Sequence, residues 1–294
     1  MNQFPSAETA SCRHLIELAL HEDLGPSSTP VADITSAWFV ASSTHGATAL
    51  VARKPGVLAG LPAAALVFAR VDPQLQFEPH IQDGAPLQPR AVIAIIRGSM
   101  TSILAAERTA LNFVQQLSGI ATLTRQYVQA VAGCRAQILD TRKTLPGWRL
   151  LAKYAVRQGG GHNHRMGLFD MVLIKDNHWS AMPSTHDLTQ RFCNFRAQHP
   201  GIPIEIEVDT LDQLDEALPA RPDIVLLDNM TLEQMREAVR RRDAVAPTVL
   251  LEASGGVNLQ TVRGIAESGV DRISVGALTH SAPALDIGLD YERS

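Results

Sequence analysis

The sequence is poor in cysteine, in aromatic residues and in long hydrophobic runs. The three cysteines, Cys12, Cys134 and Cys193, are far apart and show no CxxC spacing, which argues against a zinc site or a disulfide framework. No apolar run approaches the roughly 18 residues that a membrane helix needs, so we expect no membrane partner. The first residues carry neither a cationic start nor the apolar segment of a secretory signal. These absences predict a cytoplasmic protein.

The composition is that of a soluble globular protein with a core of helices and strands. Hydrophobic residues make up 45% of the chain, charged residues 19% and aromatic residues 5%. A length of 294 residues is enough for one large domain or two ordinary ones.

Basic residues are concentrated in one segment. Residues 142–175 contain seven Lys or Arg and a single acid, Asp170, so this segment carries +6. The whole chain carries −4, and the remainder therefore carries −10. A compact basic site in an otherwise acidic chain indicates a small polyanionic ligand, whereas nucleic acid more often requires a wide basic surface. We therefore expect no nucleic-acid partner.

The first part of the chain, to about residue 117, has the mixed pattern of an α+β domain. Pro and Gly separate its short periodic segments. An amphipathic helix is expected near residues 15–20, and a helical exit is expected in two pieces, 102–117 and 121–131. The expected strands lie at 45–53, 75–81 and 91–97.

From about residue 136 the pattern becomes regular. Apolar runs alternate with helical patterns, as in successive βα units that build a parallel sheet. Two of the helices begin with capping-box sequences, at residues 210–213 and 231–234. Six such units predict a closed or nearly closed barrel, with a doubly wound sheet as the alternative. The expected strands lie at 137–139, 171–174, 204–208, 224–227, 248–251 and 272–275.

Charged side chains or glycines follow each of these expected strands. In a βα barrel such positions converge on the carboxyl-terminal face, where barrel enzymes carry their active sites. The residues concerned are Arg142, Lys143, Lys175, Glu207, Asp209, Asp228, Asn229, Ser254, Gly255, Gly256 and Gly276.

The basic side chains at these positions suit an anionic ligand. Arg142 and Lys143 could be solvated turn residues, but His164, Arg165 and Lys175 fall at other expected loop or strand ends. Arginine matches the planar fork of a carboxylate, and lysine supplies a point charge for phosphate or carboxylate. Two alternatives stay open, namely His162 and His164 as metal ligands and Lys175 as a Schiff-base lysine.

Glu207 and Asp228 follow neighbouring strands and are the expected metal ligands. Carboxylates beside a basic pocket predict a magnesium site in which substrate phosphates share the ion. The alternative is a pair of salt bridges to Lys143 or Lys175. Glu205 and Asp209 lie on the same strand alternation as Glu207 and are reserve candidates.

Glycine-rich turns follow the last two expected strands. Ser254-Gly255-Gly256 precedes a helix expected near Asn258, and Gly276 follows the sixth strand. Paired glycine turns of this kind recur as phosphate sites in barrels, and simple tight turns are the alternative. The segment 107–112, by contrast, has the pattern of an ordinary helix with Glu and Arg on its exposed side.

Several long motifs resemble those of the quinolinate phosphoribosyltransferase family. Their specificity goes beyond a likeness of fold, because near-unbroken matches run through most of the chain. One segment, Pro26 to Ala32, is longer than the corresponding link of the family. The matching segments are 22–25, 33–36, 107–112, 116–122, 140–149, 159–168, 173–178, 205–209, 227–229, 252–256 and 274–276.

This resemblance implies a fold and an assembly. It implies an α/β protein with an N-terminal α/β sandwich domain, residues 1–117, and an incomplete TIM-like α/β barrel, residues 118–280, with a tail, 281–294, that packs back on the first domain. It also implies a homodimer in which the active site is shared, because Arg108 of one subunit reaches the site of the other. In that case Arg108 is a substrate contact and not merely a solvated helix residue.

The resemblance also implies an activity, the transfer of a phosphoribosyl group from phosphoribosyl pyrophosphate to quinolinate with decarboxylation. Arg108, Arg142, Lys143, His164 and Arg165 would hold quinolinate. Lys143, Lys175, Glu207 and Asp228 would be catalytic, with Mg²⁺ on the two carboxylates. Lys175, Ser254, Gly255, Gly256 and Gly276 would bind phosphoribosyl pyrophosphate.

Three other activities compete with this interpretation. One is a related phosphoribosyltransferase that acts on another planar carboxylic acid, such as nicotinate. Another is a Schiff-base barrel aldolase that uses Lys175. The third is a phosphate-ligand sensor without catalysis, which the retention of both cations and carboxylates disfavours.

Overall fold

The computed structural model describes residues 4–25, 33–181 and 188–291, so the long Pro26–Ala32 segment lies outside the described residues. The chain forms two compact units. The first contains residues 1–125, 144–160 and 278–294, and the second contains residues 126–143 and 161–277. The first unit thus includes residues 144–160, which the sequence analysis assigned to the barrel domain.

An antiparallel sheet forms the centre of the first unit. Its four strands have the order β12-β1-β5-β3. The expected strands at 45–53, 75–81 and 91–97 appear as β1, β3 and β5. The last strand joins β1, pairing Leu50 with Leu289, so the end of the described chain is part of this sheet. The bounds are β1 (His45–Ala52), β3 (Gln76–Pro79), β5 (Val92–Ser99) and β12 (Ile287–Tyr291), with β2 (Gly56–Val57) and β4 (Pro86–Leu87) as a separate pair.

Helices complete the first unit. The two helices expected at 102–117 and 121–131 are one continuous helix, α4 (Met100–Ala130), and this prediction was wrong. Gly119 lies inside that helix without ending it, and its lack of a side chain leaves room for the backbone of Pro283. The other helices are α1 (Ser6–Leu24), α2 (Ile34–Phe39), α3 (Leu61–Val71) and α5 (Arg149–Gln158).

The second unit is an incomplete α/β barrel. Its six strands are parallel and have the order β6-β11-β10-β9-β8-β7. The first of these strands along the chain, β6, pairs with the last, β11, whereas β6 and β7 form the two edges of the sheet and do not pair with each other. The strands are β6 (Gln137–Leu139), β7 (Val172–Ile174), β8 (Ile204–Val208), β9 (Ile224–Asp228), β10 (Leu250–Ser254) and β11 (Arg272–Ser274).

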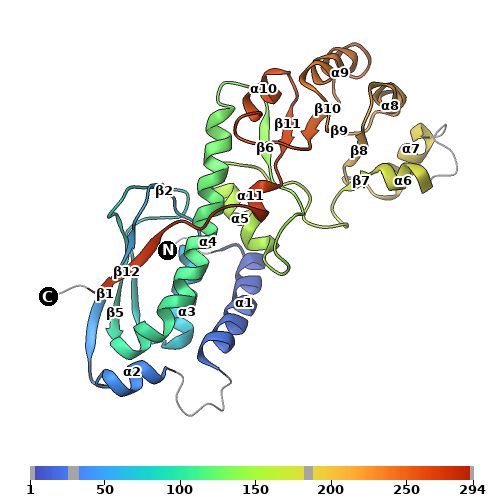
Figure 1. Cartoon of the computed structure of the whole chain (residues 1–294). Coiled ribbons are helices and arrows are strands. Elements are labelled where there is room, and N and C mark those ends of the chain that lie inside the picture. Colours follow the sequence, from blue (N-terminus) through green and yellow to red (C-terminus); the bar gives the residue numbers. More distant parts are fainter. Residues whose placement is uncertain (1–3, 26–32, 182–187, 292–294) are drawn as a thin grey trace. The chain divides into compact units, whose positions relative to one another are not determined.

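Helices follow most of these strands, and Figure 1 shows α8, α9 and α10 along one side of them. Both predicted capping boxes are confirmed, at Thr210 with Gln213 and at Thr231 with Gln234. Within the described residues, the helices are too short or too polar to cross a bilayer. The helices are α6 (Asp176–Ala181), α7 (Leu188–Gln198), α8 (Leu211–Ala217), the 3-10 turn η1 (Leu218–Ala220), α9 (Leu232–Val245), α10 (Val262–Glu267) and α11 (Ala277–His280).

The alternation of side chains along the strands separates the barrel interior from the helix layer. On β8, Ile204, Ile206 and Val208 are buried and alternate with Glu205 and Glu207. Successive strand residues point to opposite faces, so the two glutamates share the interior face. The interior of this barrel is therefore partly acidic, and the glutamate nearer the carboxyl end of the strand is the more accessible one.

Candidate functional site

A cavity of about 630 Å³ lies at the carboxyl ends of the barrel strands, where the sequence pattern predicted the active site. It brings together basic residues after β6 and β7 with acidic residues at the ends of β8 and β9. The lining residues are Thr141, Arg142, Lys143, His164, Arg165, Leu173, Lys175, Glu207, Leu226, Asp228, Asn229, Ser254, Gly255, Gly256 and Ser274.

The residues after β6 form a tight turn that presents the first two cations. The backbone N–H of Lys143 donates to Thr141 Oγ1 at 3.0 Å. Asp140, directly after the strand, is completely buried and accepts hydrogen bonds from Asn163 Nδ2 at 2.5 Å and from the His164 backbone N–H at 2.9 Å. The Asp140 carboxylate thus joins the turn after β6 to the loop that carries the next basic residues.

Side-chain acceptors also hold the loop that follows. Asp170 accepts from the backbone N–H groups of Met166 and Gly167, at 2.7 and 2.9 Å. Arg165 donates from Nη1 to the carbonyl of Met171 at 3.3 Å. Burial lowers the pKa of Arg165, and the positive charge of nearby Arg142 adds to that effect. Two arginines therefore face the same cavity at close range.

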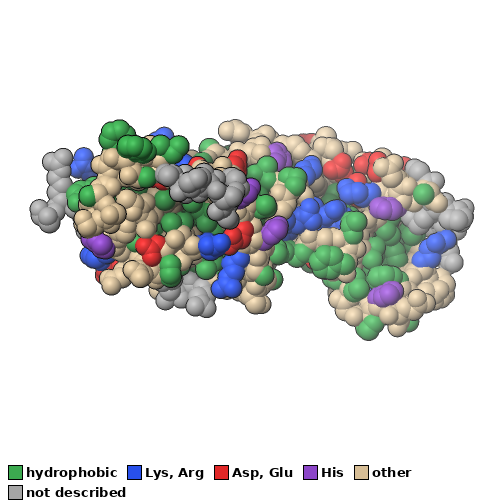
Figure 2. Space-filling model, turned by 90° about the horizontal axis from the view of Figure 1, so that it is seen from below, with side chains coloured by type: hydrophobic (Ala, Val, Ile, Leu, Met, Phe, Trp, Pro, Cys, Tyr) green, Lys and Arg blue, Asp and Glu red, His purple; other side chains and the backbone are tan. Residues whose placement is uncertain are grey.

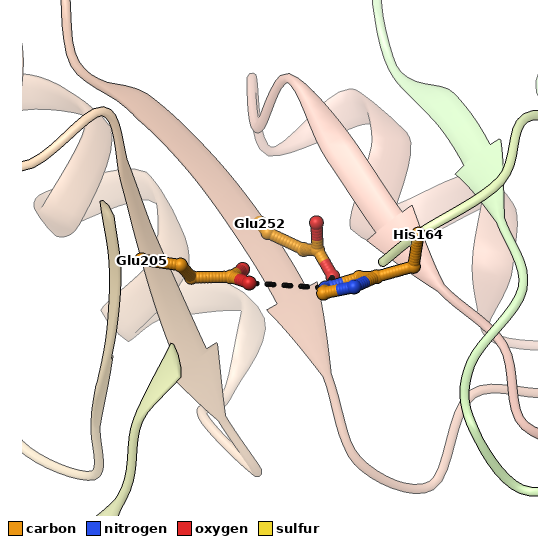
Figure 3. A group of neighbouring side chains, drawn as sticks. All are labelled: His164, Glu205 and Glu252. Carbon is orange, nitrogen blue, oxygen red and sulfur yellow. Dashed lines mark ion pairs between the residues drawn. The ribbon is translucent and has the colours of Figure 1, made fainter. Parts of the chain in front are cut away.

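His164 lies over a pair of buried carboxylates (Figure 3). Its Nε2 is 3.0 Å from Glu205 Oε2 and 3.2 Å from Glu252 Oε1, and both glutamates are fully buried. Arg272 Nε lies 2.8 Å from the other oxygen of Glu252. Among the residues that the structure describes, His164, Glu205 and Glu252 are the one group of three acidic or histidine side chains close enough to hold a metal ion. Because His164 and Arg272 already face these carboxylates, we assign the group to the protein interior.

Burial and ion pairing oppose each other in this cluster. Burial disfavours the charged imidazole, but hydrogen bonds to Glu205 and Glu252 and their negative charges outweigh it and raise the pKa of His164 to about 9. Nδ1 of the ring accepts a hydrogen bond from the Arg165 backbone N–H at 2.8 Å, so it has no room for a second hydrogen. Burial raises the pKa of Glu205, which favours a proton between this carboxyl and Nε2, whereas His164 and Arg272 outweigh burial and lower the pKa of Glu252.

Lys175 and Glu207 form an ion pair at the cavity wall. Lys175 Nζ lies 2.5 Å from Glu207 Oε2, so the alternative of a salt bridge at this carboxylate is present in the structure. Trp179 donates from Nε1 to the Glu207 carbonyl at 3.0 Å, and His178 Nδ1 accepts from the Lys175 backbone at 3.0 Å. Both strand ends are thus held from the short helix α6.

The glycine turn after β10 lies close to the loop after β9. Gly255 has φ +93°, and a side chain there would collide with Asn229 Oδ1. Asn229 in turn donates from Nδ2 to Asp228 Oδ2 at 2.7 Å. The helix expected near Asn258 begins only at Val262 and has six residues, because the Asn258 side chain forms a turn by accepting from the Thr261 backbone.

Not every predicted site residue borders this cavity. Arg108 is exposed on α4 of the first unit, and Gly276 lies just beyond β11 without lining the cavity. His162 is exposed and stays outside the buried metal-like group. Asp209 donates its backbone N–H to Gln213, within the cap of α8. Glu205, a reserve metal ligand, is buried against His164 instead.

Sequence reasoning assigned no role to several supporting residues. Asp140 and Glu252 lay inside the matching motifs, and their position directly beside predicted strand ends was the signal that could have found them. Leu226 on β9 and Ser274 on β11 also line the cavity, because they lie on the interior face of their strands. Such residues are visible only once strand register is known.

The charges of this site are local. On the face drawn in Figure 2, basic and acidic side chains lie in small groups among uncharged ones. Within the cavity, Arg142, Lys143, Arg165 and Lys175 supply four positive charges, and Glu207 and Asp228 supply two negative ones. This excess of positive charge suits a ligand with several anionic groups.

Comparison with known proteins gives two family matches that together span most of the chain. The quinolinate phosphoribosyl transferase N-terminal domain matches residues 33–118, and the C-terminal domain of the same family matches residues 120–290. The nicotinate-nucleotide pyrophosphorylase [carboxylating] of Mycobacterium leprae is 47% identical over 285 residues, covering 96% of this chain and 98% of its own.

A plant relative and a solved structure give the same picture. Quinolinate phosphoribosyltransferase [decarboxylating] 2b of Nicotiana tabacum is 38% identical over 304 residues, covering 98% of this chain and 84% of its own. The structure of the nicotinate-nucleotide pyrophosphorylase from Francisella tularensis superimposes with a TM-score of 0.88 at 36% identity, covering 99% of this chain and 98% of that one. The expected fold, a separate antiparallel sheet domain with an incomplete barrel, is confirmed.

Proposed function

The chain belongs to the quinolinate phosphoribosyltransferase family, and from this premise we propose how the residues of its cavity divide the work of the reaction. The enzyme is a pentosyltransferase of NAD biosynthesis. It transfers the phosphoribosyl group of phosphoribosyl pyrophosphate to quinolinate and releases carbon dioxide, pyrophosphate and nicotinate mononucleotide.

One observation carries the assignment of the site: four cations and two carboxylates converge on a single cavity at the strand ends. Quinolinate has two carboxylates on a planar ring, and its partner substrate has a 5-phosphate and a diphosphate. A cluster of fixed cations can bind both without rearrangement. The two carboxylates of the cavity would repel these ligands unless a cation stood between them.

Arg142, Arg165 and Lys143 hold the quinolinate carboxylates, with His164 at the same part of the wall. The guanidinium groups offer paired N–H donors, which recognise a carboxylate with a defined orientation. The mutual proximity of Arg142 and Arg165 is costly in an empty site, and a dianionic ring offsets that repulsion.

Lys175, Ser254, Gly255 and Gly256 bind phosphoribosyl pyrophosphate. The turn at Gly255 brings backbone to the cavity without an intervening side chain, and such turns bind phosphate through N–H groups. Gly276, which follows the neighbouring strand, completes the 5-phosphate site in this proposal. Helix α10, with six residues, contributes no helix-end site here.

Glu207 and Asp228 are the magnesium ligands in this proposal. They line the same cavity from neighbouring strands, and carboxylate oxygens are the donors that Mg²⁺ prefers. When bound with the substrate, magnesium supplies positive charge to the diphosphate that departs. Lys175 pairs with Glu207 and is available for the diphosphate when the carboxylate turns to a metal.

The reaction depends on the orientation of the two substrates and on the stabilisation of developing charge more than on proton transfer. The quinolinate nitrogen attacks C1 of the ribose with its lone pair, and the bond from C1 to the diphosphate oxygen breaks with its electron pair on that oxygen. Because the nitrogen carries no proton, this step needs no general base. Lys143 and Lys175 stabilise the charge on the departing group, and Glu207 or Asp228 offsets the positive charge on the ribose.

Decarboxylation follows from the charge on the ring. The quaternary nitrogen stabilises an electron pair at the adjacent ring carbon, so the bond to that carbon's carboxylate breaks and carbon dioxide leaves. The carbon then takes a proton. The arginines of the cavity hold the remaining carboxylate, which keeps the ring in place while hydrogen replaces the carboxylate that leaves.

The assembly in this proposal is a homodimer with a shared site. Arg108 is exposed on α4 and does not line the cavity, and in this proposal it contacts quinolinate in the site of a second copy of the chain. Mixing an Arg108→Ala variant with a Lys175→Ala variant tests this. Partial recovery of activity in verified heterodimers supports sharing, and no recovery contradicts it.

The alternatives are separated by assay. A phosphoribosyltransferase for nicotinate would form nicotinate mononucleotide without releasing carbon dioxide. A Schiff base would need the neutral amine of Lys175, whereas the ion pair with Glu207 uses its ammonium form, and borohydride trapping checks this directly. A sensor would show binding without turnover.

The deciding experiment mixes the purified protein with quinolinate, phosphoribosyl pyrophosphate and Mg²⁺. Nicotinate mononucleotide and labelled carbon dioxide in equal amounts support the proposal. Omission of Mg²⁺ and replacement of quinolinate by nicotinate serve as controls. Absence of product in the complete mixture contradicts the assignment.

A further inference from the structure

The two ring nitrogens of His164 are both engaged by the protein, although the residue lines the cavity. Nδ1 accepts from the Arg165 backbone N–H at 2.8 Å, and Nε2 faces Glu205 and Glu252 at 3.0 and 3.2 Å. We propose that His164 is a positioning residue, which the buried carboxylates lock so that it fixes the main chain of Arg165 for quinolinate. This inference rests on the proposed function, because it concerns how the quinolinate part of that site is held.

The carboxylates that face the ring do not themselves line the cavity. On β8, Glu207 lines the cavity, whereas Glu205, two residues earlier on the same face, does not. On β10, Ser254 lines it and Glu252 does not. His164 does line the cavity, so its ring connects the two carboxylates to the cavity wall.

The loop that carries Arg165 is held by a continuous row of side-chain acceptors. The backbone N–H groups of residues 164, 165, 166 and 167 donate in turn to Asp140, His164 and, for the last two, Asp170. Each of these four N–H groups therefore has a fixed direction. The acceptor for the Arg165 backbone N–H is His164 Nδ1, and this hydrogen bond fixes the backbone from which the Arg165 side chain extends.

Stability alone does not explain such a cluster. Burying two carboxylates, a histidine and an arginine has a high desolvation cost, and well-packed apolar residues often serve a core equally well. Here His164 and Arg272 face the two carboxylates within ion-pair distance, and in this proposal that charged group specifies one arrangement of the chain. A fixed arrangement is useful here because a small displacement of Arg165 would weaken a two-point contact with a planar dicarboxylate.

Paired substitutions at Glu205 test the proposal. Glu205→Leu removes the acceptor below His164 with little change in volume, and Glu205→Gln keeps an oxygen for the Nε2–H. We expect Glu205→Leu to raise the KM for quinolinate about tenfold, as for loss of one well-placed hydrogen bond, with the KM for phosphoribosyl pyrophosphate changed by less than about twofold. Glu205→Gln should restore most of the quinolinate KM.

A control variant separates positioning from general loosening. Arg242→Met breaks a buried ion pair with Asp271, at 2.8 Å, that lies outside the cavity lining. It should lower the melting temperature without a selective change in the quinolinate KM. Equal changes in both KM values for Glu205→Leu, or the same quinolinate change in Arg242→Met, overturn the proposal. Inactivity of the unsubstituted enzyme instead overturns the proposed function.

A second measurement does not depend on turnover. Nitrogen NMR of histidine-labelled protein, with the His164 signals assigned by His164→Gln, reports which ring nitrogen carries hydrogen. We expect an unprotonated Nδ1 before and after addition of quinolinate. Transfer of the hydrogen to Nδ1 or loss of the Nε2–H on binding would make His164 a direct ligand and overturn its positioning role.

Discussion

Lys175 Nζ and Glu207 Oε2 are 2.5 Å apart at the wall of the cavity, on neighbouring strands β7 and β8. In the proposed function Lys175 binds phosphate and Glu207 binds the metal, so substrates would separate this pair. Until then the pairing would hold both charges in place. Its contribution to stability is small, because Lys175 is nearly half exposed.

Substitution of this pair should affect catalysis more than folding. Lys175→Met is expected to lower kcat by roughly 100-fold, as for loss of one preorganised charge on a departing group. Glu207→Gln should raise the Mg²⁺ concentration needed for half-maximal rate. The double variant should lose less than the product of the single losses, because each change removes the other's partner. Strictly multiplicative losses in steady-state kinetics would contradict a shared role.

Arg142→Ala should weaken quinolinate binding selectively. The guanidinium faces the cavity beside Arg165, and removal of one partner of a partly buried ionic contact costs about 2 kcal/mol or more, a loss of at least roughly 30-fold. Titration calorimetry of each substrate measures this directly. Phosphoribosyl pyrophosphate should bind within a few fold of the unsubstituted protein. A similar loss for both substrates would show that Arg142 serves the whole cavity and not quinolinate.

Gly255→Ala should disturb the phosphate end of the site. A side chain there would meet Asn229 Oδ1 at a backbone with φ +93°, and such strain costs on the order of 1–3 kcal/mol. We expect a higher KM for phosphoribosyl pyrophosphate and a lower melting temperature. Gly256→Ala is the matched control, because at φ +59° an added Cβ has no neighbour within 4 Å. Equal effects of the two substitutions would show that the contact with Asn229 does not cause the changes in KM and melting temperature.

The sequence pattern predicted the barrel well because its signals are local. Apolar runs such as Ile204–Val208 and the capping boxes at Thr210 and Thr231 depend on neighbouring residues only. The converging cations were equally predictable, since parallel strands end at one edge. Their chemical roles came from family motifs and not from spacing.

The errors and omissions share a cause in tertiary contacts. Gly119 within α4 serves the close approach of the distant Pro283 backbone and not a helix end, and the late start of α10 depends on the turn at Asn258. The buried cluster of Glu205 and Glu252 was invisible for a similar reason. Its members are far apart in the chain, and only the strand register places them under one histidine.

The buried cluster should make stability depend on pH in the alkaline range. The pKa of His164 is raised from 6.5 to about 9 by its two carboxylate partners, so the folded protein retains a proton that the unfolded chain releases. The resulting stabilisation is fully present below about pH 6.5 and is lost as the pH rises through about 9. Within that window each pH unit removes up to about 1.4 kcal/mol. His164→Gln, which removes the imidazole from the cluster, is the control. Melting temperatures measured from pH 6 to 10 should fall more steeply for the unsubstituted protein than for His164→Gln, and parallel curves would contradict the shared proton.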